Sequence, residues 1–425
     1  MDARKGERYQ WVIYALCFAM GFITLGFCSS NNSLYTTAIT EALGMSRGAF
    51  SLRTTLRYGT SSILNLYFGA MVMRFGEKKV TCMGALCLIG AVLSAAWARG
   101  PALIYLSGVL LGAGFIGCGT TMISYIVGRW CRKNKGTIMG IVLAANGIGG
   151  AVAAQIVGPI IKDENNIFGY RNAYYMIAVM LLVLLLAVVV LLREPPKWEE
   201  SPAQNEGPAK RRRAATWEGI DYQQLSKKPF FYLTLIVVFC ASFSLATGMD
   251  NLSIHMEDQG VDNDYVTLVL SVNSLILVGS KILCGVLFDK IGLRKTMFFC
   301  QASILLSLCA MLLVSSTDLG YGMAMATSVI AALGKPVLTV MISLLVLGMF
   351  GECSYAKLVG ICSAVSTAGT AIGSWASNYA CDLAGTYVPI VAVQAVIMAI
   401  AMVVFQFCAS ASQKMRAQIE TKAEN

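Results

Sequence analysis

The stretch GVLFDKIGLRK, residues 285–295, decides the fold because an imperfect copy of it lies in the first half of the chain. The copy is GAMVMRFGEKK at residues 69–79, and two glycines of each stretch match at an offset of 216 residues. A second pair of stretches, GIVLAANGIG at 140–149 and GICSAVSTAG at 360–369, matches at an offset of 220. Two pairs at nearly one offset indicate an internal duplication, which in transporters places the substrate site near the midplane between the repeats.

Long apolar runs recur along the whole sequence. Of its 425 residues, 56% are hydrophobic and 13% are charged, against roughly 25% charged in an ordinary soluble domain. The runs are too long for strands and lack period-two alternation, so the sequence predicts an all-α membrane protein. Twelve runs are long enough to cross about 30 Å of hydrocarbon. They are residues 10–31, 50–73, 79–98, 101–127, 136–161, 172–192, 230–254, 263–288, 295–316, 319–349, 356–381 and 386–409.

One stretch between the sixth and seventh runs is charged, contains prolines and has no apolar periodicity. Such a composition is typical of a linker. We therefore expect two pseudo-symmetric halves of six transmembrane helices each. The expected parts are an N-terminal half at 1–192, a cytoplasmic linker at 193–229, a C-terminal half at 230–410 and a cytoplasmic tail at 411–425.

Positive charge is concentrated in one set of loops, together with the termini and the linker. These cations lie at residues 4–8, 74–79, 129–135, 210–213, 290–295 and 414–422. Because cytoplasmic loops carry an excess of Lys and Arg, both termini are expected in the cytoplasm, with the chain in the cell (plasma) membrane. The net charge of +10 is mostly this topology signal, and the KRRR run favours a patch near anionic lipid over nucleic-acid binding.

The sequence offers little material for enzyme chemistry. It contains one histidine, no C-x-x-C pair among its 14 cysteines, and no Walker motif. The run GAGFIG at 112–117 satisfies a nucleotide-binding pattern, but it lies inside an apolar run with no strand before it, so helix packing explains it better. We expect no catalytic residue, no metal and no cofactor, and transport driven by gradients rather than ATP.

At the repeated glycines the chain resembles the major facilitator superfamily, whose loop between helices 2 and 3 carries the pattern G-x-x-x-D-[RK]-x-G-[RK]-[RK]. The second-half stretch follows this pattern closely, whereas Met73 takes the place of the aspartate in the first half. The resemblance implies twelve helices in the major facilitator fold. It also implies a set of gating residues, namely Gly69, Arg74, Gly76, Gly285, Asp289, Gly292 and Arg294.

Three further stretches resemble the monocarboxylate transporters and the oxalate/formate antiporters. They are GRWCRKNKGTIMGIVLAANGIGG, FGYRNAYY and DLAGTYVP. These families are similar to one another in a basic residue four positions before the gating glycine of helix 8. Here that residue is Lys281, before Gly285, although the relatives usually carry arginine. The resemblance therefore implies that Lys281 contacts an anionic substrate.

Lys281 is also unusual without any resemblance. The next charge, Asp289, is eight residues on, which puts Lys281 about 12 Å further into the membrane along a helix. A lysine there costs about 2.5–3.5 kcal/mol on insertion scales, so it must face a wet cavity or a counter-charge. We expect it to bind a substrate anion; the alternative is a structural pairing with an acid, for which Asp250 is the plausible partner.

Other polar residues of the predicted helices are weaker candidates. Lys335, beside a proline, is either a second anion contact or bound to backbone carbonyls that the proline frees. Arg57 either lines the outer vestibule or forms an ion pair at the outer gate. Asn146, Asn273 and Tyr35 are candidates to orient a carboxylate, although such groups more often serve helix packing.

The predicted interior is thus cationic, which suits a small organic anion and disfavours cationic drugs. The leading hypothesis is a monomeric secondary transporter of a monocarboxylate-like anion, working by alternating access as a proton symporter or an anion exchanger. Asp250 is the candidate for proton coupling. The alternatives are a drug or sugar transporter of the same fold and a nutrient sensor that does not transport.

Overall fold

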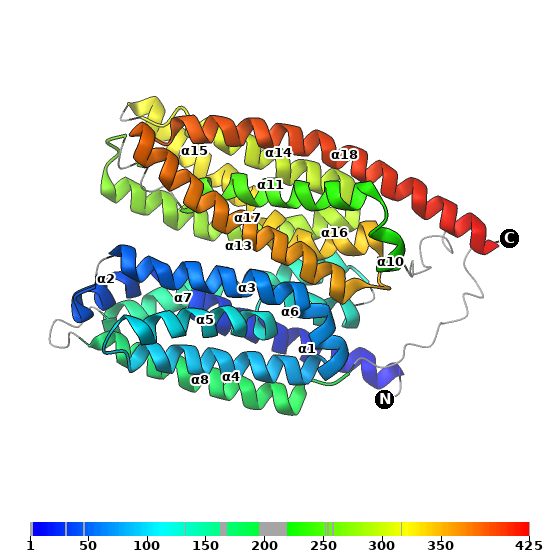
Figure 1. Cartoon of the computed structure of the whole chain (residues 1–425), viewed down its shortest axis with the longest axis horizontal. Coiled ribbons are helices and arrows are strands. Elements are labelled where there is room, and N and C mark those ends of the chain that lie inside the picture. Colours follow the sequence, from blue (N-terminus) through cyan, green and yellow to red (C-terminus); the bar gives the residue numbers. More distant parts are fainter. Residues whose placement is uncertain are drawn as a thin grey trace.

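The structure is a computed structural model of the chain. It describes residues 3–29, 32–45, 47–131, 133–161, 168–194, 219–250, 252, 255–256, 259–315 and 317–424. All the regular secondary structure in these residues is helical. The helices run roughly parallel to one long axis and form two groups, which are separated in sequence and lie one above the other in Figure 1.

The first group holds the helices before residue 192. In chain order they are α1 (Ala3–Met20), the π-helical η1 (Gly21–Phe27), α2 (Asn32–Leu43), α3 (Arg47–Phe75), α4 (Glu77–Ala96), α5 (Pro101–Cys118), α6 (Thr120–Trp130), α7 (Lys135–Ile161) and α8 (Gly169–Leu191).

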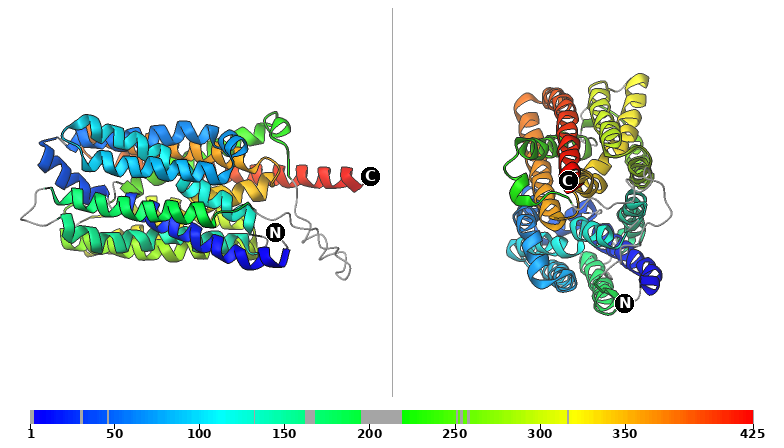
Figure 2. Two further views of the ribbon diagram at one scale, coloured as in Figure 1. Left: turned by 90° about the horizontal axis from the view of Figure 1, so that it is seen from below. Right: turned by 90° about the vertical axis from the view of Figure 1, so that its right-hand side faces the viewer.

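The second group holds the helices after residue 221, so α10 lies inside the predicted linker range 193–229. It consists of α10 (Tyr222–Leu225), α11 (Pro229–Asp250), α13 (Asn263–Ile291), α14 (Leu293–Met311), α15 (Asp318–Gly334), the 3₁₀ segment η2 (Lys335–Leu338), α16 (Val340–Phe350), α17 (Tyr355–Ala384) and α18 (Val388–Glu424). Both termini lie at the same end of the molecule, and α18 extends past the bundle there (Figure 2). We call this the terminal end, and the other the far end.

Eleven segments of the described chain are long and apolar enough to cross a membrane. The predicted second span corresponds to α3, which has 29 residues but is not among the eleven. Its sequence explains this, because Arg53, Arg57 and Asn65 all fall within it. The residues that make α3 too polar for a simple span are therefore candidates for function.

Small residues let the helices within each half approach closely. A Cβ added to Gly84 of α4 would lie 2.7 Å from the Cα of Gly117 on α5, and one added to Gly26 of η1 would lie 2.6 Å from Gly149 on α7. This is the expected packing mode in lipid, where van der Waals contact replaces the hydrophobic effect. Gly117 belongs to the GAGFIG run, so that run packs helices as predicted.

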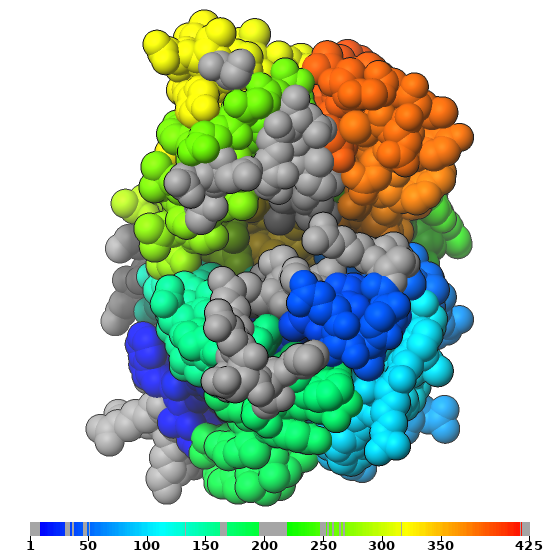
Figure 3. Space-filling view, turned by 90° about the vertical axis from the view of Figure 1, so that its left-hand side faces the viewer, coloured from blue at the N-terminus to red at the C-terminus, as the bar shows by residue number. Residues whose placement is uncertain are grey.

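The two halves contact each other toward the terminal end. There α3 runs beside α17 and α7 beside α13, through contacts such as the hydroxyl of Ser62 donating to the carbonyl oxygen of Ala364 at 3.0 Å. Figure 3, which faces the far end, shows the C-terminal half above and the N-terminal half below. Further along α3 toward that end, a Cβ on Gly59 would meet nothing within 4 Å.

Candidate functional site

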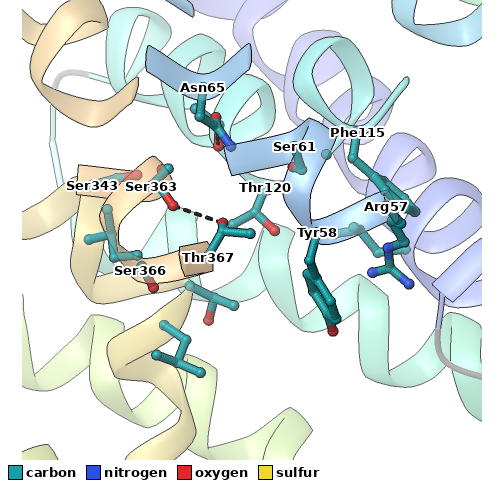
Figure 4. Close-up of a pocket in the computed structure, with 16 residues that line it drawn as sticks. Arg57, Tyr58, Ser61, Asn65, Phe115, Thr120, Ser343, Ser363, Ser366 and Thr367 are labelled. Atoms are coloured by element: carbon teal, nitrogen blue, oxygen red, sulfur yellow. Dashed lines mark hydrogen bonds between the residues drawn. The ribbon is translucent and has the colours of Figure 1, made fainter. Parts of the chain in front are cut away.

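A cavity of about 160 Å³ lies between the halves (Figure 4). For comparison, an engineered protein cavity of about 150 Å³ binds one benzene molecule, so this one has room for a small organic solute. Its described lining residues are Leu25, Arg57, Tyr58, Ser61, Asn65, Phe115, Gly119, Thr120, Thr121, Leu338, Thr339, Ile342, Ser343, Ser363, Ser366 and Thr367.

The chemistry of this lining is polar and cationic. Nine of the described lining residues carry a hydroxyl group, one is an amide and one is a cation, and none is a carboxylate. Hydroxyl and amide groups bind neutral oxygens in a substrate, whereas the cation favours a negative charge.

Two breaks in pseudo-symmetric helices position part of the lining. One separates α5 from α6 at Gly119, and the other separates α15 from α16 through η2 and Thr339. Gly119 and Thr339 are 220 residues apart, the offset of the second repeat, and α6 and α16 each have 11 residues. The first N–H groups of a helix lack intrahelical partners. The cavity therefore receives the positive ends of two helix dipoles, one from each half.

Sequence explains the second break better than the first. Pro336 has no backbone N–H to donate and cannot continue a helix without strain. Thr339 then has φ −127° and ψ −81°, outside the helical region, and its buried hydroxyl has no described hydrogen-bond partner. Gly119 has an extended backbone, with φ −91° and ψ −166°. No comparable sequence feature distinguishes Gly119 from the other glycines of that run.

Arg57 is the one predicted substrate residue that lines the described cavity. Its Nη2 donates to the Ser29 hydroxyl at 2.8 Å. The guanidinium carbon lies 4.7 Å from the ring centroid of Phe115 and 5.0 Å from that of Tyr58. Two aromatic faces and one hydroxyl hold the group in place without neutralising it.

Lys281 is not among the described residues that line the cavity. It is 2% exposed, and its Nζ donates to the carbonyl oxygen of Leu143 on α7, in the other half, at 3.1 Å. Among the described side chains it makes no salt bridge. The partner of this buried ammonium group is thus a backbone carbonyl, where the sequence predicted a wet cavity or a counter-charge.

Lys335 and Asn273 form a second polar cluster next to Lys281. The Nζ of Lys335 donates to the Oδ1 of Asn273 at 2.6 Å, and the Nδ2 of Asn273 donates to the carbonyl oxygen of Ser328 at 2.7 Å. Lys335 is close enough to Lys281 for the two charges to repel each other. The cluster therefore gathers two cations on the C-terminal half.

The remaining predicted candidates lie elsewhere. Tyr35 is buried and stacks on Tyr174, with ring centroids 4.5 Å apart, and it lines a small separate pocket with Arg53. Asn146 is half-buried on α7 and does not line the described cavity. Asp250 is the last residue of α11, and its side chain is outside the described part of the structure.

The predicted gating stretch of the second half holds the two halves together. The carboxylate of Asp289 accepts hydrogen bonds from the backbone N–H groups of Gly136 and Thr137, at 3.0 and 2.7 Å, and from the Thr137 hydroxyl at 2.7 Å. It therefore caps the N-terminus of α7 from the opposite half. At the matching position of the first half, Met73 is 75% exposed, so that lock has no counterpart there.

The predicted gating glycines have two structural roles. Gly76 and Gly292 adopt positive φ, at 79° and 81°, a conformation that disfavours other residues. Gly69 and Gly285 allow backbones of opposite halves to touch, because a Cβ on Gly285 would lie 2.1 Å from the carbonyl oxygen of Gly136. The two arginines of the set are peripheral: Arg74 lies over the ring of its neighbour Phe75, and the Nε of Arg294 donates to Gln406 on α18 at 2.6 Å.

Sequence reasoning missed Asn65, a 3% exposed residue of the cavity. One signal could have found it. Asn65 lies four residues before Gly69, as Lys281 lies four before Gly285, so the repeat offset of 216 relates the two. A polar residue at the register of the predicted anion contact was visible in the first-half copy.

Comparison with known proteins identifies the family. The family model of the Major Facilitator Superfamily matches residues 16–323 and 251–423. The chain belongs to this superfamily. It is also 22% identical over 329 residues to the uncharacterized MFS-type transporter YcxA of Bacillus subtilis (strain 168), covering 75% of this chain and 76% of that protein.

Solved structures of the superfamily share the fold. The proton:xylose symporter XylE bound to 6-bromo-6-deoxy-D-glucose aligns with a TM-score of 0.72 at 12% identity, over 94% of this chain and 95% of that one. The E. coli fucose:proton symporter FucP aligns with a TM-score of 0.69 at 13% identity, over 94% and 99%. This chain is therefore a membrane transporter of the superfamily and not an enzyme. The comparisons support the superfamily, and the nearer resemblance to monocarboxylate and oxalate/formate carriers stays a prediction.

Proposed function

We propose that the chain is a secondary transporter of a small organic anion, which it carries by alternating access. The observation that supports the anion is the cavity, whose described lining contains the cation Arg57 and no carboxylate. Lys281 and Lys335 add positive charge on the side of the C-terminal half. Fields of one sign in a low-dielectric cleft attract ions of the opposite sign.

A neutral sugar is the second candidate. The nine hydroxyl-bearing residues of the described lining suit a sugar, and the names of two proteins of similar fold describe them as sugar:proton symporters. Arg57 separates the two candidates, because a guanidinium in the cavity lining strengthens the binding of an anion far more than that of a neutral solute.

The transport cycle follows from the contacts between the halves. Asp289 on the N-terminus of α7 and the ion pair of Lys135 with Glu352 join the halves at the terminal end. With the termini in the cytoplasm, as the charge distribution predicts, this conformation is closed to the cytoplasm. Rocking one half against the other would break these contacts and open that side. Coupling to protons, with Asp250 as the candidate group, and exchange of anions both remain predictions.

The test is uptake into proteoliposomes of labelled carboxylates and labelled sugars. A hydrogen bond to a charged group contributes about 1.5–3 kcal/mol, so Arg57→Gln should weaken binding of a transported anion by about ten- to hundredfold. Lys79→Gln is the control, since it removes an equal charge from an exposed position outside the cavity. If the protein takes up sugars and not carboxylates, and sugar uptake is unchanged in Arg57→Gln, then the substrate is a sugar and the anion proposal is wrong.

A further inference from the structure

Three residues form a ladder on one face of α3. Arg57, Ser61 and Asn65 are spaced four apart, so they lie on the same side of the helix, and all three line the cavity. The ladder thus presents a cation, a hydroxyl and an amide in sequence. Arg57 and Asn65 are separated by about 12 Å along the helix axis.

The repeat places a matching ladder on α13. At the offset of 216, Arg57 corresponds to Asn273, Ser61 to Leu277 and Asn65 to Lys281. The backbones are equivalent too: a Cβ on Gly360 would lie 2.5 Å from the carbonyl oxygen of Asn65, and one on Gly140 would lie 2.4 Å from that of Lys281. Cation and amide have therefore changed places between the two halves.

The two ladders differ in how their hydrogen bonds are satisfied. On α13, Asn273 bonds to Ser328 and Lys335 within its own half. On α3, the Oδ1 of Asn65 accepts a hydrogen bond from the hydroxyl of Thr121 at 3.2 Å. This bond fixes the amide, but no described group of the protein accepts a hydrogen bond from its nitrogen. Figure 4 shows that nitrogen turned into the cavity, on the side of Ser61 and Thr120.

Because this nitrogen faces the cavity, an oxygen of a bound solute can accept a hydrogen bond from it. Two N–H donors of a neutral amide suit a neutral oxygen, such as that of a hydroxyl group. Ser61, Thr120 and Ser363 surround the same space with hydroxyls that both donate and accept. An alkyl chain in this position would leave all of these groups unpaired.

We propose that Asn65 is a specificity-determining residue and that the cavity takes a polyhydroxylated monocarboxylate. The carboxylate lies at Arg57, and a hydroxyl oxygen accepts from the Asn65 amide at the other end of the ladder. This inference rests on the proposed anion site and deepens it, because it selects among organic anions by their hydroxyl groups.

The experiment compares matched probes on the purified full-length protein. Binding of glycerate and gluconate is measured by calorimetry against propionate and hexanoate, which have the same carbon chains without hydroxyls. Glycerol and glucose supply the hydroxyls without the carboxylate. We expect at least one hydroxylated anion to bind about tenfold or more tightly than its alkanoate and its neutral counterpart.

Asn65→Leu tests the residue, since leucine has a similar size and no donor. It should weaken binding of the hydroxylated anion about tenfold, the effect of losing a hydrogen bond in a buried polar site, and leave the alkanoate within about twofold. A monodisperse elution profile and an unchanged melting temperature show that the variant is folded.

The two proposals fail in different ways. If alkanoates bind as tightly as hydroxylated anions, or if neither hydroxylated anion binds, the inference about hydroxyl groups is wrong while an anion site can still stand. Equal weakening of both probe classes in folded Asn65→Leu would also overturn it. If the neutral compounds bind as tightly as the anions, the anion site itself is wrong.

Discussion

The Nζ of Lys281 donates a 3.1 Å hydrogen bond to the backbone carbonyl oxygen of Leu143, which belongs to the opposite half. A helical carbonyl has a second lone pair, so it accepts this bond without losing its place in the helix. The bond joins α13 to α7 only while the halves are in contact here. It therefore stabilises one conformation of the transporter relative to the other.

We predict that Lys281→Gln abolishes transport while membrane expression stays near that of the parent. Expression is retained because the glutamine removes a charge that costs about 2.5–3.5 kcal/mol in the membrane interior. Solute binding should weaken less than in Arg57→Gln, since Lys281 adds to the positive field but is outside the described cavity lining. Lys281→Arg keeps the charge and should retain part of the transport.

Uptake and calorimetric binding measured on the same preparations separate these effects. A Lys281→Gln protein that transports like the parent would show that the charge serves neither binding nor the conformational cycle. A loss of binding equal to that of Arg57→Gln would place Lys281 in direct contact with the solute, as the family resemblance implies.

The sequence predicted a single residue well where placing that residue in the membrane interior costs much free energy. An isolated lysine in an apolar run must have a partner, so Lys281 was found from sequence, but the partner was not. It is a backbone carbonyl from a distant helix, and every residue carries one. Asn65 was missed because a lone amide in a helix is ordinary; its repeat register with Lys281 was the one sequence signal, and its place between Thr121 and the cavity appears only in the structure.

At the scale of elements, the sequence predicted single spans at 101–127 and 319–349, whereas the structure divides the first into α5 and α6 and the second into α15 and α16. Pro336, which follows Lys335, predicted a kink at the position of the second break. The break at Gly119 carried no such signal, because glycines are frequent throughout α5 and mostly serve packing. The repeat could have transferred the break from one half to the other.

Gly285 offers a test of the close contact between α13 and α7. We predict that Gly285→Ala destabilises the conformation closed at the terminal end, because its Cβ would lie 2.1 Å from the carbonyl oxygen of Gly136. Gly69→Ala should act likewise, since its Cβ would lie 2.6 Å from the Cα of Lys357. Spin-label distances between the halves at the terminal end should lengthen in both variants.

The matched controls lie on the same helices. A Cβ on Gly279 of α13 or on Gly59 of α3 would meet no atom within 4 Å, and alanine favours a helix over glycine by about 1 kcal/mol. Gly279→Ala and Gly59→Ala should therefore leave the distances unchanged. Equal effects of contact and control glycines would show that the close approach does not govern closure.

On the scale of the whole molecule, the twofold repeat predicted much of the architecture, because each half must bury its apolar faces in the same way. Where the halves meet could not be predicted from sequence, since either end of such a bundle can close. The contacts at Asp289 and at Gly69 belong to one of these states. Alternating access requires a second state in which they are separated.

The last prediction concerns which side of the membrane this closed end faces. Lys and Arg are enriched in the loops at the terminal end, and such loops remain in the cytoplasm. Asp262, just before α13, and Lys227, just before α11, are both exposed. Because α11 runs between them, they lie at opposite ends of the bundle. With the exposed Cys309 and Cys353 replaced by serine, a membrane-impermeant maleimide should label Asp262→Cys in intact cells and Lys227→Cys only after permeabilisation. Labelling of Lys227→Cys in intact cells would invert the orientation, and the closed end would then face outward.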